Sequence, residues 1–470
     1  MKRKKATALL VTAALGVSVA ACAARATIQP GDNFKANAPS SSDAATATTA
    51  SPTATPAEVA GSPAPTEASA SNATPAAETA SWPQWRGPNR DGNVVGVAPP
   101  RVWPKSLKEQ WKVTVGVGHS SPVVSDGRAF VFARQGDDEV LMCLDAATGK
   151  EIWRSANPSV AYEMNPAARG HGKGPKSTPV VSGGRVFTLG ITGVLSAHDA
   201  KTGKVVWRKN FAGQYPNTSP LYGTSMSPLV EDNLVVAHVG GHDKGALTAF
   251  EAATGKVKWS FEPDGPAYSS PVVFKVGGER QIVTFTQKEL VAVSASNGIL
   301  RWKLPAKSSY DTNSVTPFVY KDTIIYSLEE QGMTAVRPVK QGSSFAAQQV
   351  WRNDETELYM NSPVAEGNLL FGMSVRKKGQ FFCLDADTGK TVWLGPGRAG
   401  ENAAMLNFAG TLLALTNDAK LIVLPATAKE YAPAAEYTVA NSPTWAHPVV
   451  VGGARILVKD ETTLASFSIE

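Results

Sequence analysis

The sequence predicts an all-β fold, an eight-bladed β-propeller of four-stranded antiparallel blades in which an N-terminal strand completes the last blade. Three observations predict it. A nine-residue phrase recurs along the chain, first as DAATGKEIW at Asp145–Trp153 and last as DADTGKTVW at Asp385–Trp393. Aromatic residues that end the repeat units recur every 42 to 54 residues, a spacing typical of propellers and solenoids. The last unit stops before any such phrase, and the missing piece, EQWKVTVG, lies at Glu109–Gly116.

Each repeat unit reads as short strands joined by turns. The segment Gly184–Ala200 is rich in Val, Phe, Leu and Ile, is broken by glycine, and shows no helical period. The phrase Asp-x-x-Thr-Gly-Lys then predicts a turn, because Asp can accept bonds from its own downstream backbone and Gly203 can adopt a positive φ. Eight unit openings can be placed, from HSSPVV near the start to AHPVVV near the end. Four strands per unit then give eight blades.

One tryptophan ends most units, and a large flat ring repeated once per unit suits the seam between neighbouring sheets. We predict this blade-docking role for Trp111, Trp153, Trp207, Trp259, Trp302, Trp351 and Trp393. Tyr437 takes the next place. Three units depart from the pattern: the fourth turns at SASNGILRW, the fifth is expanded (RPVKQGSSFAAQQVW), and the seventh (PATAKEYAPAAEY) lacks glycine and tryptophan. Those blades are expected to be less regular.

The N-terminal residues are typical of a secretory signal, since MKRKK is followed by a short apolar run and small residues. The stretch VAAC that ends at Cys22 resembles the lipobox of bacterial lipoproteins, which predicts a signal peptide at 1–21 and lipid attached to Cys22. The residue after the cysteine, Ala23, favours the outer membrane in that resemblance. The alternative is ordinary cleavage after Ala26, which would release a soluble protein.

Composition divides the rest of the chain. Residues 22–81 are dominated by Ala, Thr, Ser and Pro and predict a disordered tether. An N-terminal extended segment at 82–108 and the propeller at 109–470 follow. The formal charge of +6 includes four cations of the signal, so about +2 remains after its removal. That balance argues against nucleic acid as a partner.

Cysteine and histidine placement predicts no metal site and no disulfide. Cys143 and Cys383 occupy equivalent places in the first and sixth units, too far apart around a ring for a disulfide, and are expected to be small buried residues. The six histidines show no metal-ligand spacing; His238 and His242 are expected in a turn. The basic, glycine-rich stretch Arg169–Ser177 is interpreted as a solvated loop above the second blade rather than an anion site.

The phrase DA-x-TGK-x-x-W resembles the repeat of pyrroloquinoline-quinone-like (PQQ-like) propellers, over roughly residues 82–470. That family includes quinoprotein dehydrogenases and the BamB-type lipoprotein subunit of the outer-membrane β-barrel assembly machine. The stretches WPQWRGPNRDG at Trp82–Gly92 and GTSMSPLVEDNLVVAHVGGHDKGALTAF at Gly223–Phe250 also resemble secreted bacterial members. The repeat is a packing device shared by enzymes and scaffolds, so it predicts fold more strongly than activity.

The favoured functional hypothesis is a non-catalytic protein-interaction scaffold. Loops that enter the inner strands form one wide propeller face. We expect the partner or ligand face to include His119, Lys176, Tyr268, Asn313, Asn361 and Trp445. Together with a lipid anchor and a tether, the resemblance implies a periplasmic, outer-membrane-anchored protein whose partners are envelope proteins, including the barrel assembly machinery. No catalytic residue and no cofactor are expected in this hypothesis.

The alternative is a PQQ-dependent dehydrogenase of alcohols or sugars. The resemblance would then imply a quinone above the ring centre, calcium held by carboxylate and amide oxygens, and an Asp base. The chain lacks the adjacent cysteines of many such enzymes and any Cys-x-x-Cys-His haem motif. Asp311 and Asn313 come nearest to a calcium ligand set, although a turn-capping role is favoured for both. Sensing of a small ligand or sugar at the same face stays open.

Overall fold

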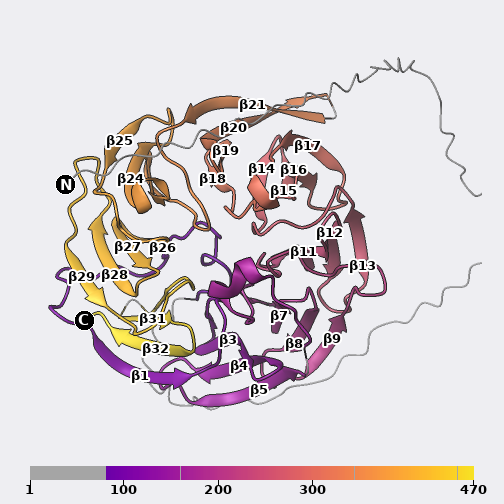
Figure 1. Cartoon of the computed structure of the whole chain (residues 1–470), viewed down its shortest axis with the longest axis horizontal. Coiled ribbons are helices and arrows are strands. Elements are labelled where there is room, and N and C mark those ends of the chain that lie inside the picture. The colour runs from indigo at the N-terminus through magenta and orange to yellow at the C-terminus, as the bar shows by residue number, and fades with distance from the viewer. Residues whose placement is uncertain (1–80, 159, 343, 453) are drawn as a thin grey trace, which may run out of the picture. The chain divides into compact units, whose positions relative to one another are not determined.

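A computed structural model describes residues 81–470 apart from 159, 343 and 453. The predicted signal peptide, the Cys22 anchor and residues 22–80 of the predicted tether lie outside the described residues. Within the described part, the strands form eight four-stranded antiparallel sheets set around a ring (Figure 1), which confirms the predicted eight-bladed propeller. No helix in the described part is both long and apolar enough to cross a membrane.

The first four blades run from an inner strand near the axis to an outer strand at the rim (Figure 1). Blade one is β2 (Val123–Ser125), β3 (Arg128–Gln135), β4 (Asp138–Asp145) and β5 (Glu151–Asn157); blade two is β6 (Val180–Ser182), β7 (Arg185–Leu189), β8 (Leu195–Asp199) and β9 (Val205–Lys209). Blade three is β10 (Leu229–Glu231), β11 (Leu234–Gly241), β12 (Lys244–Glu251) and β13 (Val257–Phe261); blade four is β14 (Val272–Val276), β15 (Glu279–Phe285), β16 (Glu289–Ser294) and β17 (Leu300–Pro305).

The remaining blades repeat this order. Blade five is β18 (Phe318–Tyr320), β19 (Thr323–Leu328), β20 (Gly332–Gln341) and β21 (Ser344–Asn353); blade six is β22 (Val364–Glu366), β23 (Leu369–Ser374), β24 (Gln380–Asp385) and β25 (Thr391–Leu394). Blade seven is β26 (Ala403–Phe408), β27 (Thr411–Thr416), β28 (Lys420–Pro425) and β29 (Ala435–Thr438); blade eight is β30 (Val449–Val451), β31 (Arg455–Lys459), β32 (Thr463–Ser468) and β1 (Lys108–Thr114). The short 3-10 helices are η1 (Pro166–His171), η2 (Ser309–Asp311) and η3 (Arg376–Lys378).

Blade eight closes the ring by joining the two ends of the propeller. Strand β1 pairs antiparallel with β32, with Val113 opposite Leu464 and Thr114 opposite Thr463. This confirms the predicted closure by an N-terminal strand. Pairing β1 outside β32 ties residues more than 340 positions apart, so the last blade has the same four strands as the others.

The repeated phrase builds a tight turn that receives the tryptophan of the preceding blade. In blade one, Asp145 Oδ1 accepts bonds from the backbone nitrogen of Thr148 (2.8 Å) and from its hydroxyl (2.8 Å). In blade three, Gly255 adopts a φ of 69°, and a Cβ there would lie 2.8 Å from the Trp207 ring of blade two. The Trp207 indole also donates to the Ala252 carbonyl (3.0 Å), so it is bonded across the seam. Glycine is therefore required both for its backbone angle and for the space beneath the ring.

The same contact recurs around much of the ring. Tryptophan rings face the phrase glycine of the next blade in the pairs Trp111–Gly149, Trp153–Gly203, Trp259–Gly298 and Trp351–Gly389. Each outer-strand tryptophan also pairs with a small residue on the neighbouring strand, as Trp153 does with Cys143 and Trp393 with Cys383. Both cysteines are free and buried, as the sequence predicted.

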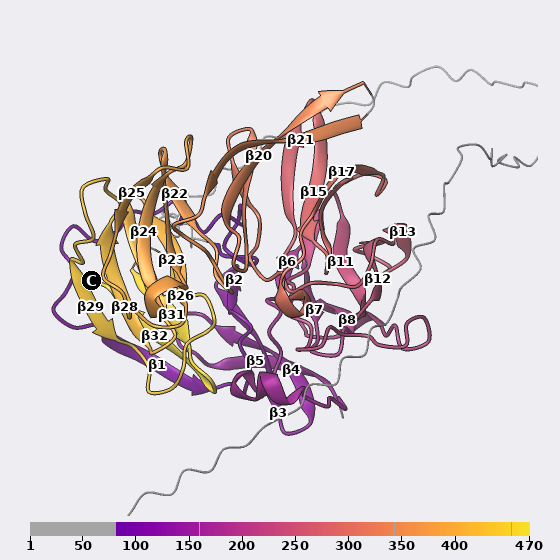
Figure 2. The same cartoon turned by 45° about the horizontal axis from the view of Figure 1, so that its top comes forward.

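Blade five replaces the phrase with a longer hairpin. Trp302 of blade four has no phrase turn to receive it, and its indole donates to Gln281 Oε1 of its own blade (2.9 Å). Strands β20 and β21 run ten residues each and project beyond the ring (Figure 2). Phe345 of this hairpin joins the same apolar cluster as Trp302. The hairpin thus covers the seam that a phrase turn covers elsewhere.

The N-terminal segment 82–94 crosses to the inner strands rather than lying over the rim. Trp82 exchanges backbone hydrogen bonds with Val124 of blade one (2.8 and 2.9 Å), and Pro83 accepts one from Val181 of blade two (2.8 Å). Gly92 and Val94 bond to the backbone of Asn407 in blade seven (2.9 and 2.8 Å). Figure 1 shows this indigo stretch reaching the middle of the ring.

Two buried arginines pin the same segment to further blades. Arg86 donates to the Pro363 carbonyl of blade six and to the Asp91 carbonyl (2.8 Å). Arg90 donates to the Ser227 and Pro228 carbonyls at the start of blade three (3.2 and 3.1 Å). The segment therefore holds opposite sides of the ring together at its axis.

Candidate functional site

A cavity of about 380 Å³ lies on the propeller axis, at the face where loops enter the inner strands. Its walls come from the N-terminal segment, the 3-10 helices η1 and η2, and the residues that precede the inner strands. Trp85 contributes the N-terminal part of the wall: its indole donates to Thr316 Oγ1 of blade five (3.3 Å), and its ring packs on His447 of blade eight (centroids 4.4 Å apart).

Four of the six residues predicted for the partner or ligand face line this cavity. They are His119, Lys176, Tyr268 and Trp445. The His119 ring is tilted by 55° to that of Trp445, with ring centroids 6.1 Å apart. Lys176 Nζ donates to the Tyr222 carbonyl (2.6 Å), and Tyr268 Oη accepts from the Tyr222 backbone nitrogen (3.2 Å).

The other two predicted residues do not line the cavity. The side-chain amide of Asn313 donates to the Thr286 and Gln287 carbonyls (2.9 and 3.1 Å), and that of Asn361 donates to the Met373 carbonyl (3.1 Å). Both side chains are buried. Their position in the loops was predicted correctly, but the amides are turned toward backbone carbonyls that need donors.

The loop interpreted from sequence as solvated contributes directly to the cavity, which corrects that interpretation. Within Arg169–Ser177, His171 and Lys176 line the cavity and Lys173 is exposed. The His171 ring lies 4.8 Å from that of Trp445 and 5.9 Å from that of His119, centroid to centroid. The turn prediction for the paired histidines holds only for His242, because His238 lies buried inside β11, bonded to the Asp264 carbonyl (3.0 Å).

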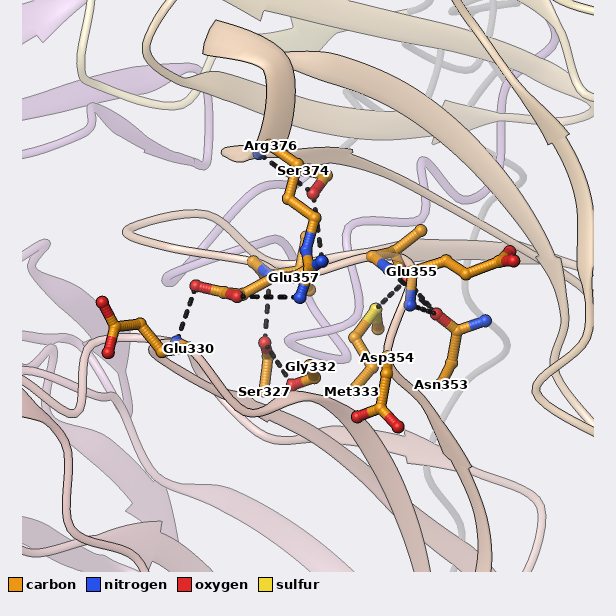
Figure 3. Close-up of polar contacts among 12 residues, drawn as sticks. Ser327, Glu330, Gly332, Met333, Asn353, Asp354, Glu355, Glu357, Ser374 and Arg376 are labelled. Carbon is orange, nitrogen blue, oxygen red and sulfur yellow. Dashed lines mark hydrogen bonds and ion pairs between the residues drawn. The ribbon is translucent and has the colours of Figure 1, made fainter.

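The wall between blades five and six is positioned by the polar network in Figure 3. Asn353 Oδ1 accepts from the backbone nitrogens of Glu355 (3.0 Å) and Thr356 (2.9 Å). The Glu357 carboxylate accepts from the Glu330 backbone nitrogen (2.9 Å) and pairs with Arg376 (3.6 Å). This network fixes the chain immediately before the two residues that reach the cavity, Tyr359 and Met360.

Burial sets the protonation of the groups around the axis. Burial, together with the nearby Lys459 cation, lowers the pKa of His119 to about 3, so this imidazole is neutral at pH 7. Burial also lowers the pKa of Lys176 to about 8. Burial raises the pKa of Glu329, whose carboxylate accepts from Thr312 Oγ1 (3.4 Å).

More cations lie around the axis. Lys459 is fully buried and its ammonium donates to the Gly118 carbonyl and to the Asp460 carbonyl (3.0 Å). Burial lowers the pKa of Lys459 to about 8, that of Arg86 to about 10 and that of Arg90 to about 9. In the described part of the chain, none of these three side chains forms an ion pair with a carboxylate. Asp91 acts electrostatically on Arg86, and Asp460 and Glu461 act on Lys459, so these carboxylates partly offset the positive field of the three cations at the axis.

The donor set does not fit a calcium-bound quinone. Glu329 is the one carboxylate among the described residues that line the cavity, and Ca²⁺ takes six to eight oxygen ligands. Among the described residues, no group of three or more His, Cys, Asp or Glu side chains is placed to hold a metal. Asp311, the candidate ligand from sequence, lies in η2, and Asn313 is committed to backbone carbonyls.

A family model described as outer membrane protein assembly factor BamB matches residues 90–170 and 137–394, more than half of the chain. The chain belongs to this family. BamB of Yersinia pestis is 24% identical over 330 residues, which is 65% of this chain and 75% of that protein.

This BamB-family chain is similar to dehydrogenases at the same level of identity. The dehydrogenase subunit of the alcohol dehydrogenase (quinone) of Komagataeibacter europaeus is 25% identical over 347 residues, and the chain spans only 43% of that protein. Among solved structures, BamB from Moraxella catarrhalis matches with a TM-score of 0.54 at 10% identity, over 77% of this chain and 98% of that one. Quinohemoprotein alcohol dehydrogenase from Comamonas testosteroni matches with 0.61 at 15%, over 84% and 81%. These structural matches show the shared fold.

Sequence reasoning missed several residues of the cavity. Trp85, His171, Tyr222 and Tyr359 line it but were not among the predicted face residues. The Trp82–Gly92 stretch was noted for its resemblance, yet nothing local says that it inserts at the axis. His171 could have been predicted from the sequence, because it lies with Lys176 in one basic, glycine-rich loop before an inner strand.

Proposed function

We propose that this BamB-family chain is a non-catalytic, membrane-tethered periplasmic scaffold that holds envelope proteins against its loop face. The observation that carries the proposal is the donor set of the axial cavity, which offers one carboxylate and no cluster of metal ligands among the described residues. The family description and the 75% span of the Yersinia pestis BamB support the same function. In this proposal the lipidated Cys22 anchors the head to the outer membrane.

The docking surface would be the rim of the cavity. Tyr310 in η2 is 77% exposed and Met360 is 39% exposed, and both line the mouth of the cavity. Exposed aromatic and methionine side chains at a rigid rim are typical anchors of protein interfaces. Strands on all sides hold these loops in place, which suits a scaffold.

Capture of a purified barrel-assembly protein by the full chain tests this function. We expect Tyr310→Ala with Met360→Ala to weaken capture at least tenfold, since interface anchors each contribute about 2 kcal/mol or more. Val257→Ala, on the outer strand β13 and 59% exposed, is the matched control and should leave capture unchanged. Equal capture by the double variant and wild type would place the docking surface elsewhere, and no capture by wild type would remove this function.

The second candidate, a PQQ-dependent dehydrogenase, is favoured by the dehydrogenase relatives and by the aromatic walls of the cavity. Adding pyrroloquinoline quinone and calcium to the purified chain separates the two. The scaffold function predicts no calcium-dependent melting shift and no dye reduction with alcohols or sugars. A positive result in both assays would replace the scaffold by the enzyme.

A further inference from the structure

The axial cavity contains a cation that nothing in the described part of the chain neutralises. Lys176 Nζ donates one hydrogen bond, to the Tyr222 carbonyl (2.6 Å), and an ammonium group has three donors. No ion pair of the described residues includes Lys176. A partly buried ammonium without an anionic partner is costly unless something else supplies the negative charge.

A second polar group beside it also lacks a partner. His119 Nε2 is buried without a hydrogen-bond partner in the described part of the chain, although the imidazole also interacts with the His171 backbone. The imidazole packs against the rings of His171 (5.9 Å between centroids) and Trp445 (6.1 Å). Because burial keeps this histidine neutral, one ring nitrogen can donate to an anion without adding charge.

The rest of the wall is aromatic. Trp85, Trp445, Tyr222, Tyr268 and Tyr359 all line the cavity, and its volume of about 380 Å³ lies at the small end of the range typical of small-molecule sites. Flat rings of this kind favour a flat apolar body. The carboxylate of Glu329, on another part of the wall, would repel a ligand with a second negative charge.

We propose that the axial cavity is a metal-free binding site for a small aromatic monocarboxylate, with Lys176 as its counter-ion and His119 as a second donor. The ligand's ring would lie among the tryptophan and tyrosine side chains. The buried cations Arg86, Arg90 and Lys459 add a long-range positive field in support of the carboxylate. The site is independent of protein docking at the rim, so either property can fail without the other.

Isothermal titration of the full chain with 4-hydroxybenzoate tests the site. We expect saturable 1:1 binding of 4-hydroxybenzoate, at least tenfold weaker binding of the uncharged 4-hydroxybenzamide, and no binding of the cation tyramine. The expected ratio follows from a charge-assisted hydrogen bond, which contributes about 1.5–3 kcal/mol, or roughly 10- to 100-fold in affinity.

Variants of one loop localise the binding. Lys176→Met removes the charge but keeps an unbranched side chain, and should weaken 4-hydroxybenzoate binding about 10- to 100-fold. Lys176→Arg keeps the charge and should bind within a few fold of wild type. Lys173→Met, an exposed lysine in the same loop outside the cavity lining, is the matched control and should bind as wild type does. Melting curves of all three show whether each variant is folded.

Three results would overturn the proposal. The first is binding of 4-hydroxybenzamide as tight as that of 4-hydroxybenzoate, which would mean that charge is not recognised. The second is unchanged binding by a folded Lys176→Met variant. The third is binding of 4-hydroxybenzoate only in the presence of calcium, or no binding at millimolar concentrations, which would exclude a metal-free carboxylate site.

Discussion

Lowering the pH from 7 to 5 is expected to destabilise the folded propeller through three buried histidines. Burial lowers the pKa of His198 to about 4, that of His238 to about 4 and that of His447 to about 3. The unfolded chain binds these protons near pH 6.5 while the folded chain does not, so stability present above pH 6.5 is lost as the pH falls. At pH 5 each of these histidines contributes a loss of about 2 kcal/mol, and the three together about 6 kcal/mol. His119, whose pKa burial lowers to about 3, adds a loss of the same sign.

Denaturant unfolding at pH 7, 6 and 5 measures this loss, and single variants assign it. His198→Asn keeps a polar group near Ser155 Oγ, which lies 3.1 Å from His198 Nδ1, and should lose about 2 kcal/mol less than wild type between pH 7 and 5. His242→Gln, in the β11–β12 turn, is the control. Comparison with variants is needed because burial raises the pKa of Glu139. The folded chain then binds this proton more readily than the unfolded chain, so Glu139 adds stability as the pH falls and opposes the effect of the histidines. A His198→Asn curve parallel to wild type would contradict the assignment.

Replacing Trp207 by alanine is expected to cost about 3–5 kcal/mol of unfolding free energy, the usual range for truncation of a buried tryptophan. The ring fills the seam between blades two and three, lies over Gly255, and donates to the Ala252 carbonyl. Truncation would leave a cavity at the seam and an unpaired carbonyl. Equilibrium unfolding in guanidinium chloride measures the change.

Two further substitutions complete this test: a control at an exposed neighbour of Trp207, and a substitution of the glycine beneath the indole. Val206→Ala removes an exposed apolar side chain next to Trp207 and should change stability by no more than about 0.5 kcal/mol. Gly255→Ala should also destabilise, because φ is 69° and the new methyl group would press on the indole. Trp207→Ala and Val206→Ala with equal unfolding free energies would mean that the indole does not secure the seam.

The blades could be predicted because the residues that specify each turn and outer strand lie close together in the sequence. The turn phrase, the glycine that ends it and the tryptophan that follows lie within nine residues, so Asp199–Trp207 already specifies a turn and the start of an outer strand. The regular spacing of the phrase then gives the number of units. The last unit has no phrase and outer strand of its own, and the strand before blade one supplies that outer strand. Of the three blades predicted to be less regular, blade five is the one with a longer hairpin, and Phe345 of that hairpin covers the seam at Trp302. Blade four receives Trp259 over Gly298 as the phrase turns do, and blade seven has four strands like the others.

The candidate site was predicted in part for the same reason. Residues just before inner strands share one face, and His119, Lys176, Tyr268 and Trp445 do lie together in the wall of the cavity. That a partner or ligand binds at this face stays a prediction. Side-chain direction is not encoded in that position. Asn313 and Asn361 turned to backbone carbonyls because a buried carbonyl without a donor is costly, and the sequence does not say which carbonyls lie nearby.

The sequence by itself determined the all-β class, the number of blades and the way the ring closes, since each depends on short-range turn chemistry repeated at a regular spacing. Only the tertiary structure decided that the segment 82–94 inserts at the axis and forms part of the wall of the cavity that holds Lys176. Those features depend on contacts such as Arg86 with Pro363 and Trp85 with His447, between residues hundreds of positions apart. Such contacts form only when the closed ring brings the inner strands of all blades to one axis. No local sequence pattern predicts which residues then meet there.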